Sequence, residues 1–125
     1  MLITMCTGKL HCVRVTDANL NYQGSITIDA YLMKKAGIRP FQLVHINNKS
    51  NAVHWETYAI PGKAKSGMIC LNGGPARLFQ PGDQVIILAL ADMTPEEADV
   101  LEQTVVHVND KNKITKLEIK KPSDF

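Results

Sequence analysis

Residues 24–37 read GSITIDAYLMKKAG and place a strand directly before a short helix. Ser25–Ile28 alternates polar and apolar residues, as a half-buried strand does. Asp29 is a typical helix N-cap residue, and Gly37 stands where a helix ends in a left-handed residue. We therefore predict a strand over Ser25–Ile28 that leads into a helix ending before Gly37.

Most of the remaining chain also reads as short strands separated by turn residues. The polar pair Thr7-Gly8 is expected to separate the first two strands. A second short helix is predicted after Thr94, where TPEE combines a capping box with proline at the first helical position. Many short strands with two short helices indicate a mainly β fold, a compact β-barrel with short flanking helices. The expected strands cover 2–5, 9–16, 25–28, 43–46, 53–60, 68–71, 85–90, 104–108 and 114–119.

Length and composition limit the classes of function. The 125 residues suit one domain, and the net charge of +2 is too small to predict a nucleic-acid partner. Three cysteines without CxxC spacing argue against a disulfide framework and against a structural zinc site. The longest apolar run, Val85–Ala91, is far shorter than the ~20 residues that span a bilayer. We therefore expect a cytoplasmic protein without a membrane partner.

Motifs for common chemistry are few. The four histidines include no pair at i, i+4, so we predict no metal site. Phosphate-loop, dinucleotide-binding and nucleophile-elbow motifs are absent from the sequence. Gly24-Ser25 taken alone is most simply a turn entering a sheet. No single motif identifies a reaction.

The combination of short motifs is more specific. GKLH at 8–11, YQGS at 22–25, ITID at 26–29, ETYAI at 56–60, LNG at 71–73, ARL at 76–78 and PGD at 81–83 follow in this order. Together they resemble the bacterial aspartate alpha-decarboxylases, a pyruvoyl-dependent family, from residue 1 to about residue 108. The resemblance implies a double-psi β-barrel that assembles as a homotetramer.

The resemblance also implies that the chain is made as an inactive precursor and cuts itself. The Ser25 hydroxyl attacks the Gly24 carbonyl to form an ester, and elimination and hydrolysis leave a pyruvoyl group at position 25. Thr57 matches the residue that stabilises the oxyanion during this attack. Gly24 is expected to tolerate strained backbone at the bond. The products are residues 1–24 and 25–125, and some relatives need a maturation helper protein for the cleavage.

The implied reaction converts L-aspartate to β-alanine, a precursor of pantothenate and coenzyme A, without a metal or pyridoxal phosphate. The pyruvoyl ketone forms a Schiff base with the substrate amine and accepts the electrons released as carbon dioxide leaves. Tyr58 matches the proton donor, and Lys9 matches a residue that holds a substrate carboxylate. The other residues matched to the substrate pocket are His11, Tyr22, His54, Thr57, Asn72, Gly73, Gly74 and Pro75.

Two features depart from the family pattern. The family has an arginine in place of His54, and a guanidinium binds carboxylate bidentately with a permanent charge, whereas histidine is largely neutral at pH 7. The family usually reads Asn-Gly-Ala-Ala where this chain has residues 72–75, and Pro75 has no N–H to donate. Two alternatives therefore stay open: the same machinery acting on a different amino acid, and an unprocessed barrel that only binds a ligand.

Overall fold

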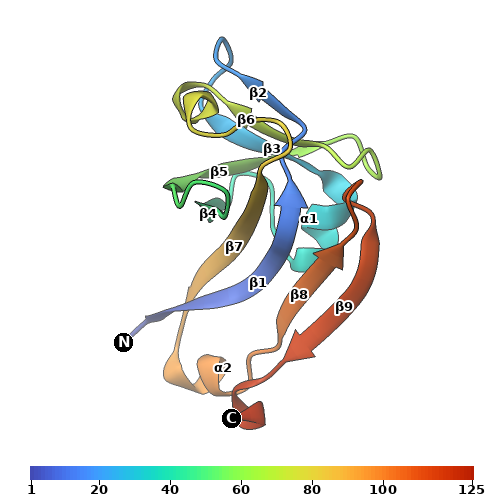
Figure 1. Ribbon diagram of the computed structural model, residues 1–125. Coiled ribbons are helices and arrows are strands. Elements are labelled where there is room, and N and C mark those ends of the chain that lie inside the picture. The colour runs from blue at the N-terminus through green and yellow to red at the C-terminus, as the bar shows by residue number, and fades with distance from the viewer.

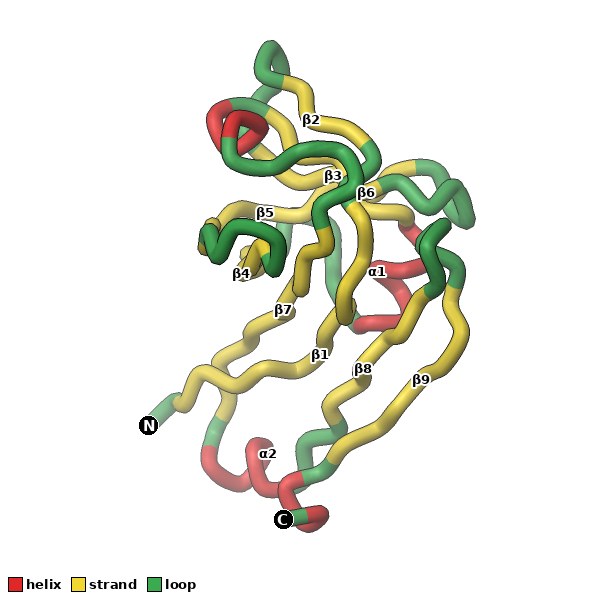
Figure 2. The backbone as a smooth tube through the Cα atoms, in the orientation of Figure 1, coloured by secondary structure: helices red, strands yellow, loops and turns green.

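In the computed structural model, which describes residues 1–125, nine strands form a single curved sheet and the helices are few and short (Figures 1 and 2). The expected mainly β class is confirmed. The strands are β1 Ile3–Arg14, β2 Asp17–Asn19, β3 Ser25–Asp29, β4 Leu43–Asn48, β5 His54–Gly62, β6 Ile69–Asn72, β7 Gln84–Met93, β8 Gln103–Val108 and β9 Ile114–Lys120. The helices are α1 Ala30–Ala36 and α2 Pro95–Asp99, with 3-10 turns η1 Gly74–Arg77 and η2 Pro122–Asp124.

The strand-to-helix transition from β3 to α1 is confirmed with its caps. The Asp29 carboxylate accepts a hydrogen bond of 2.8 Å from the backbone N–H of Tyr31, and Gly37 ends the helix at a φ of 73°. The same buried carboxylate accepts the backbone N–H groups of Lys65 and Gly67, at 2.8 and 2.9 Å. Asp29 therefore fixes both the start of α1 and the loop that leads into β6.

The sheet runs in the order β2-β6-β3-β5-β4-β7-β1-β8-β9. Three neighbouring pairs are parallel, namely β1 with β8, β2 with β6 and β3 with β5, and the other pairs are antiparallel. This mixed, mainly β arrangement is consistent with the expected double-psi β-barrel. The strands predicted at 104–108 and 114–119 are present as β8 and β9, which pair as an antiparallel hairpin.

One contiguous core of 19 buried residues fills the concave side of the sheet. Leu10, Ile28, Ile87 and Phe79 are completely buried within it. Truncating any one of these side chains to alanine costs about 2–5 kcal/mol of stability, because the cavity collapses only in part. The core therefore holds the strands that carry the site in a fixed register.

The predicted break between the first two strands is wrong. β1 runs without interruption from Ile3 to Arg14, with register irregularities after Cys6 and again before Val13. A Cβ atom on Gly8 would lie 1.9 Å from the carbonyl oxygen of Ala36 at the end of α1. Gly8 therefore allows β1 to pass directly against the helix and does not end the strand.

None of the helices has the length and apolar character needed to cross a membrane. The three cysteines are free thiols, and each is half-buried. Burial raises the pKa of the Cys70 thiol, and the negative charge of Asp17 raises it further. The Cys70 thiol is therefore protonated at neutral pH.

Candidate active site

The Gly24–Ser25 peptide bond lies where the loop after β2 enters β3 (Figure 1). Ser25 is the first residue of β3, and its side chain is completely buried. Its hydroxyl donates a hydrogen bond of 3.3 Å to the carbonyl oxygen of Gln23. A buried serine hydroxyl is thus held against its own chain at the predicted cleavage bond.

Asn72, the last residue of β6, lies directly opposite Ser25 across the two strands. Its side-chain Nδ2 donates hydrogen bonds to Ser25 Oγ at 3.0 Å and to Thr27 Oγ1 at 2.9 Å. Its Oδ1 accepts the Cys70 thiol at 3.3 Å. With both sides of the amide engaged, Asn72 has a single orientation and directs an N–H donor at the serine oxygen.

The glycine requirement at this bond differs from expectation. Gly24 does not have a positive φ, and a Cβ atom there would meet nothing within 4 Å, so neither backbone conformation nor space requires glycine at position 24. Gly73 instead has a φ of 79°, and a Cβ there would lie 2.8 Å from the Cα of Gly24. Only glycine at position 73 allows the β6–η1 backbone to pack directly against the cleavage bond.

Thr57 and Tyr58 reach the same region through the parallel pairing of β5 with β3. Ile26 on β3 pairs with Ala59 on β5. Ser25 and Tyr58 are the residues directly before this pair, one on each strand. Both tyrosine and threonine side chains are half-buried, and neither hydroxyl makes a hydrogen bond within the chain. Two unengaged hydroxyl groups therefore lie on the strand next to Ser25.

Three further predicted residues frame this region. Tyr22 lies in the loop before the bond, with 56% of its surface exposed. Gly74 begins η1, and Pro75 is buried in its first turn. Backbone N–H groups in the first turn have no partner within the helix, so the N–H that proline lacks is not needed there. Gly73 N–H donates to the Asn19 carbonyl at 2.7 Å, and the Gly73 carbonyl accepts from Ala76 N–H at 3.0 Å, so Gly73 is held between the end of β2 and η1.

Lys9 and His11 are not brought to Ser25 within the chain. They lie on β1, which three strands (β5, β4 and β7) separate from β3 in the sheet. Four strand spacings correspond to ~19 Å along the sheet. His11 Nδ1 is buried without a partner, and burial lowers the His11 pKa, assisted by the positive charge of Lys9. His11 is therefore neutral at pH 7 and offers no fixed charge to a carboxylate.

His54 lies at the start of β5, four residues or ~13 Å from Tyr58 along the strand. Its Nε2 lies 3.0 Å from a Glu56 carboxylate oxygen, and its Nδ1 lies 2.7 Å from Asn47 Oδ1. The hydrogen bond from His54 lowers the Glu56 pKa, and the electrostatic interaction with His45 lowers it further. The predicted carboxylate-binding histidine is thus already paired with a carboxylate of the protein.

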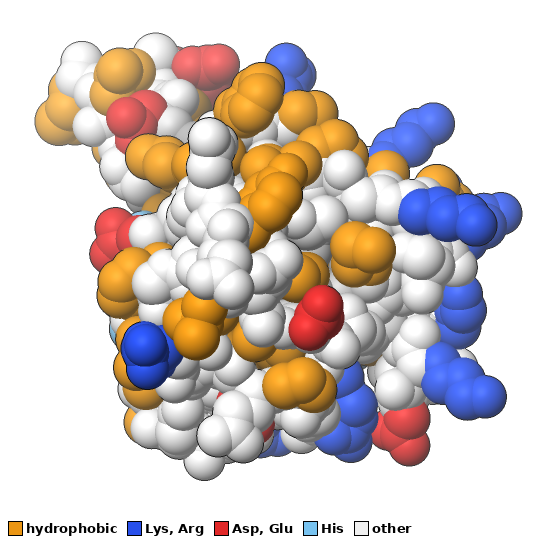
Figure 3. Space-filling model, turned by 90° about the horizontal axis from the view of Figure 1, so that it is seen from above, with side chains coloured by type: hydrophobic (Ala, Val, Ile, Leu, Met, Phe, Trp, Pro, Cys, Tyr) orange, Lys and Arg blue, Asp and Glu red, His pale blue; other side chains and the backbone are white.

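The end of the molecule that carries β2 presents a group of hydrophobic side chains on a mixed surface. Figure 3 views this end and shows hydrophobic side chains gathered over the middle, with most Lys and Arg side chains toward one edge. Leu20 and Tyr22 from the loop after β2, and Leu78 after η1, are among the exposed large hydrophobic residues. Exposed apolar side chains therefore lie on and beside the cleavage loop.

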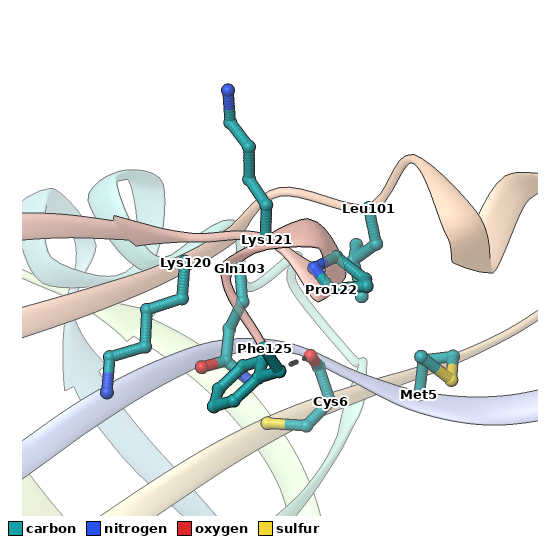
Figure 4. A pocket seen from close by; sticks show the side chains of 8 residues that line it. All are labelled: Met5, Cys6, Leu101, Gln103, Lys120, Lys121, Pro122 and Phe125. Carbon is teal, nitrogen blue, oxygen red and sulfur yellow. Dashed lines mark hydrogen bonds between the residues drawn. The ribbon is translucent and has the colours of Figure 1, made fainter.

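A separate hollow lies at the other end of the molecule, between the start of β1 and the C-terminal turn. Figure 4 shows Phe125 lying beside Cys6, and Gln103 Nε2 donating to the Cys6 carbonyl at 3.1 Å. No residue matched to the catalytic machinery lines it, so we do not assign the reaction there. Its lining consists of Met5, Cys6, Leu101, Gln103, Lys120, Lys121, Pro122 and Phe125.

Sequence reasoning missed three residues that the structure ties to the predicted ones. Thr27 shares the Asn72 amide with Ser25, and Glu56 and His45 surround His54. The i, i+2 spacing of Ser25 with Thr27 and of His54 with Glu56 was an available signal, because alternate residues on a strand share a face. His45 had no such local signal, because it lies on the neighbouring strand.

Comparisons with known proteins agree with this geometry. The family model described as aspartate decarboxylase matches residues 1–115. The aspartate 1-decarboxylase of Clostridium beijerinckii is 52% identical over 117 residues, which cover 94% of each chain. That of Bacillus subtilis is 51% identical, covering 94% of this chain and 92% of its own, and that of Salinibacter ruber is 46% identical, covering 99% and 87%. The chain belongs to the aspartate decarboxylase family.

Proposed function

We propose that this chain cleaves itself at Gly24–Ser25 and then decarboxylates L-aspartate to β-alanine, which serves pantothenate and coenzyme A synthesis. The observation that carries the proposal is the buried Ser25 hydroxyl, held by Asn72 beside the tight contact of Gly73 with Gly24. Family membership over residues 1–115 supports the same reaction.

The residues around Ser25 suit the self-cleavage chemistry. Ser25 Oγ adds to the Gly24 carbonyl carbon, the bond from this carbon to the Ser25 nitrogen breaks, and the hydroxyl proton passes to the nitrogen. Loss of the Ser25 α-proton then expels the Gly24 carboxylate and leaves dehydroalanine, which hydrolyses to a pyruvoyl group and ammonia. The Asn72 N–H holds Oγ in position for the attack and stabilises the negative charge that Oγ takes up as the Gly24 carboxylate leaves. Thr57 is the candidate donor for the oxyanion on the Gly24 carbonyl.

The decarboxylation requires binding of the substrate and delivery of a proton to its α-carbon. A pyruvoyl group at position 25 supplies a conjugated carbonyl that takes up the electrons released with carbon dioxide. Tyr58 delivers the proton that replaces the lost carboxylate on the α-carbon, since its hydroxyl is unengaged on the strand next to position 25. The Lys9 ammonium and the His54 imidazole bind the remaining carboxylate.

Carboxylate binding by Lys9 and His54 supports the expected homotetramer. Lys9 lies four strands from Ser25, ~19 Å along the curved sheet, and His54 lies ~13 Å from Tyr58 along β5, so strand pairing within the chain brings neither residue beside Ser25. Phe41 and Leu43, beside Tyr58, are 75% and 70% exposed, an apolar surface that another copy can cover. We propose that a neighbouring subunit supplies Lys9 and His54; a monomeric mass by light scattering, in a protein that retains activity, contradicts this assembly.

Replacing Asn72 with alanine should slow self-cleavage by on the order of 10- to 100-fold. A hydrogen bond to a charged group contributes about 1.5–3 kcal/mol, and this one stabilises the serine oxygen as it gains charge. The conversion of precursor into fragments is followed by denaturing gel electrophoresis over time. Asn109→Ala, which removes an exposed asparagine in the turn between β8 and β9, is the matched control and should cleave normally. Equal rates for the two variants contradict the role of Asn72.

The proposed substrate is tested with the cleaved protein and a panel of amino acids. L-Aspartate should give β-alanine and carbon dioxide, while glutamate, asparagine and uncharged amino acids should give little product. Preference for another amino acid keeps the decarboxylase machinery but overturns the substrate. No product from any amino acid by fully cleaved protein supports the ligand-binding barrel instead.

Replacing His54 with arginine should lower the KM for aspartate by about tenfold, which corresponds to ~1.4 kcal/mol of binding. A guanidinium has enough N–H donors to keep the contact with Glu56 and still bind a substrate carboxylate with a permanent charge. Steady-state kinetics with a chelator present give the KM and kcat of both proteins. His107→Arg, at another histidine paired with a glutamate, is the control. An unchanged or raised KM in His54→Arg shows that position 54 does not bind the substrate.

A further inference from the structure

Two adjacent strands bring three metal-ligating side chains together on one face of the sheet. His45 on β4 lies directly opposite Glu56 on β5, and Asn47 lies directly opposite His54. His45 Nε2 is 3.4 Å from one Glu56 carboxylate oxygen, and His54 Nε2 is 3.0 Å from the other. One ligand atom from each of the three side chains falls within 4.8 Å of the others.

These spacings suit a first-row transition metal better than a hard cation. Two imidazoles and one carboxylate form the ligand set of many Zn²⁺ and related sites, whereas Mg²⁺ and Ca²⁺ favour oxygen ligands alone. Tetrahedral Zn²⁺ with bonds of ~2.0–2.1 Å keeps its ligand atoms ~3.3 Å apart. The two contacts of Glu56 with the imidazoles are close to this separation, and the ligand atoms, which all lie within 4.8 Å of one another, must close to it when the ion binds.

A fourth side chain orients one of the imidazoles. Asn47 Oδ1 lies 2.7 Å from His54 Nδ1, so it accepts the proton on that nitrogen and leaves Nε2 facing Glu56. An outer hydrogen bond of this kind is typical of metal-binding histidines, because it fixes both the tautomer and the ring plane. The neighbouring ring of His45 packs edge-on against that of His54, with centroids 5.0 Å apart.

The open side of the cluster faces a hollow of about 260 Å³. His45 and Glu56 form part of its wall, and Asp92 on the far wall is already engaged by the Thr4 hydroxyl. Water or a small anion can therefore reach an ion held by the cluster. The full lining is Thr4, Leu43, His45, Glu56, Leu90, Ala91 and Asp92.

We propose that His45, His54 and Glu56 bind one divalent transition-metal ion of the Zn²⁺ class, with Asn47 orienting His54 and at least one coordination position open to the hollow. The site is distinct from the cleavage bond at Ser25 and has no role in building the pyruvoyl group. With the ion bound, both nitrogens of His54 are engaged, so His54 binds a substrate carboxylate only in the metal-free chain. It lies on the same face as Lys9, because Leu88 is paired with both Lys9 and His45.

A second histidine–glutamate pair provides an internal control. His107 Nε2 lies 3.0 Å from Glu118, the same contact as in the proposed site. The only other aromatic ring beside His107 is that of His11, at 5.4 Å between centroids. His107, Glu118 and His11 do not bring three ligand atoms together. Removing His107 therefore removes a comparable imidazole–carboxylate pair without touching the proposed site.

The test uses the full chain without a histidine tag, freed of metal with a chelator and titrated with Zn²⁺ by calorimetry. One Zn²⁺ per chain should bind with a dissociation constant of about 1 μM or below. His45→Ala, His54→Ala and Glu56→Gln should each weaken binding by about 100-fold, and Asn47→Ala by about 10-fold. His107→Ala should bind as the unmodified chain does.

The proposal is overturned by the absence of binding in this range, or by binding that His45→Ala and His54→Ala leave unchanged. Circular dichroism establishes that each variant is folded, which is expected because these side chains lie at the surface. Co²⁺ provides a second readout, since its visible spectrum reports the ligands. A strong thiolate-to-cobalt absorption band would assign the metal to the cysteines and also overturns the proposal.

Discussion

The Ser25→Ala variant is expected to remain an uncut chain of 125 residues without any decarboxylase activity. The side-chain oxygen is both the nucleophile that attacks Gly24 and the atom whose departure creates the pyruvoyl group, so no other residue replaces it. The fold should survive, because the Asn72 amide keeps its hydrogen bonds with Thr27 and Cys70. Denaturing mass spectrometry and an assay for β-alanine measure the two effects.

Ser123→Ala is the matched control for this experiment. Ser123 is exposed in the C-terminal turn, far from Ser25 along the chain, and its hydroxyl makes no hydrogen bond within the protein. This variant should cleave and react as the unmodified chain does. Cleavage of Ser25→Ala at the same bond, or activity in its uncut form, is incompatible with a pyruvoyl group made from Ser25.

The Tyr58→Phe variant should cleave normally but lose decarboxylase activity by about 10²- to 10⁴-fold, the usual contribution of a positioned general acid. Self-cleavage and decarboxylation respond differently because Tyr58 delivers a proton to the substrate, whereas Ser25 carries out the cleavage of the chain. The aromatic ring keeps its contact with Phe41, at 6.1 Å between centroids, so the local packing is preserved. The kcat of the cleaved variant, with the extent of cleavage measured in the same sample, gives the result.

Tyr31→Phe controls for the loss of a tyrosine hydroxyl elsewhere in the protein. Tyr31 lies on α1 with its ring beside the ammonium groups of Lys35 and Lys65. Its substitution should leave both cleavage and kcat close to those of the unmodified chain. A Tyr58→Phe enzyme with near-normal kcat shows that another group delivers the proton.

Local features of the fold could be predicted because nearby residues determine them. The caps of α1 at Asp29 and Gly37 follow from the side chains at those positions. At Thr94, the hydroxyl accepts from Glu97 N–H at 3.2 Å, while the Glu97 carboxylate accepts from Thr94 N–H at 3.0 Å. These hydrogen bonds lower the Glu97 pKa, as a charged capping carboxylate requires.

Long-range features could not be predicted from the chain alone. The three parallel strand pairs join segments far apart in the sequence, and no local pattern specifies them. The continuity of β1 through Gly8 depends on the carbonyl of Ala36, 28 positions later, which the glycine accommodates. A glycine between two apolar runs reads locally as a break, and only the packing against α1 reveals its role.

The candidate site likewise contains residues that motifs predicted and a contact that they did not predict. Ser25, Thr57, Tyr58 and Asn72 were identified through motifs, and the structure places Asn72 on Ser25 and Thr57–Tyr58 on the next strand. The contact of Gly73 with Gly24 was not foreseen, because two backbones meet there without any side chain to mark them.

Self-cleavage at Gly24–Ser25 is the central claim, and the intact mass of the purified protein under denaturing conditions tests it most directly. The predicted result is two species, residues 1–24 and residues 25–125, the second beginning with a pyruvoyl group in place of serine. The pyruvoyl terminus makes this fragment lighter than one that begins with serine, which separates self-cleavage from proteolysis. A single species with the mass of residues 1–125, unchanged after prolonged incubation, or a second fragment that begins with an unmodified serine, contradicts the claim.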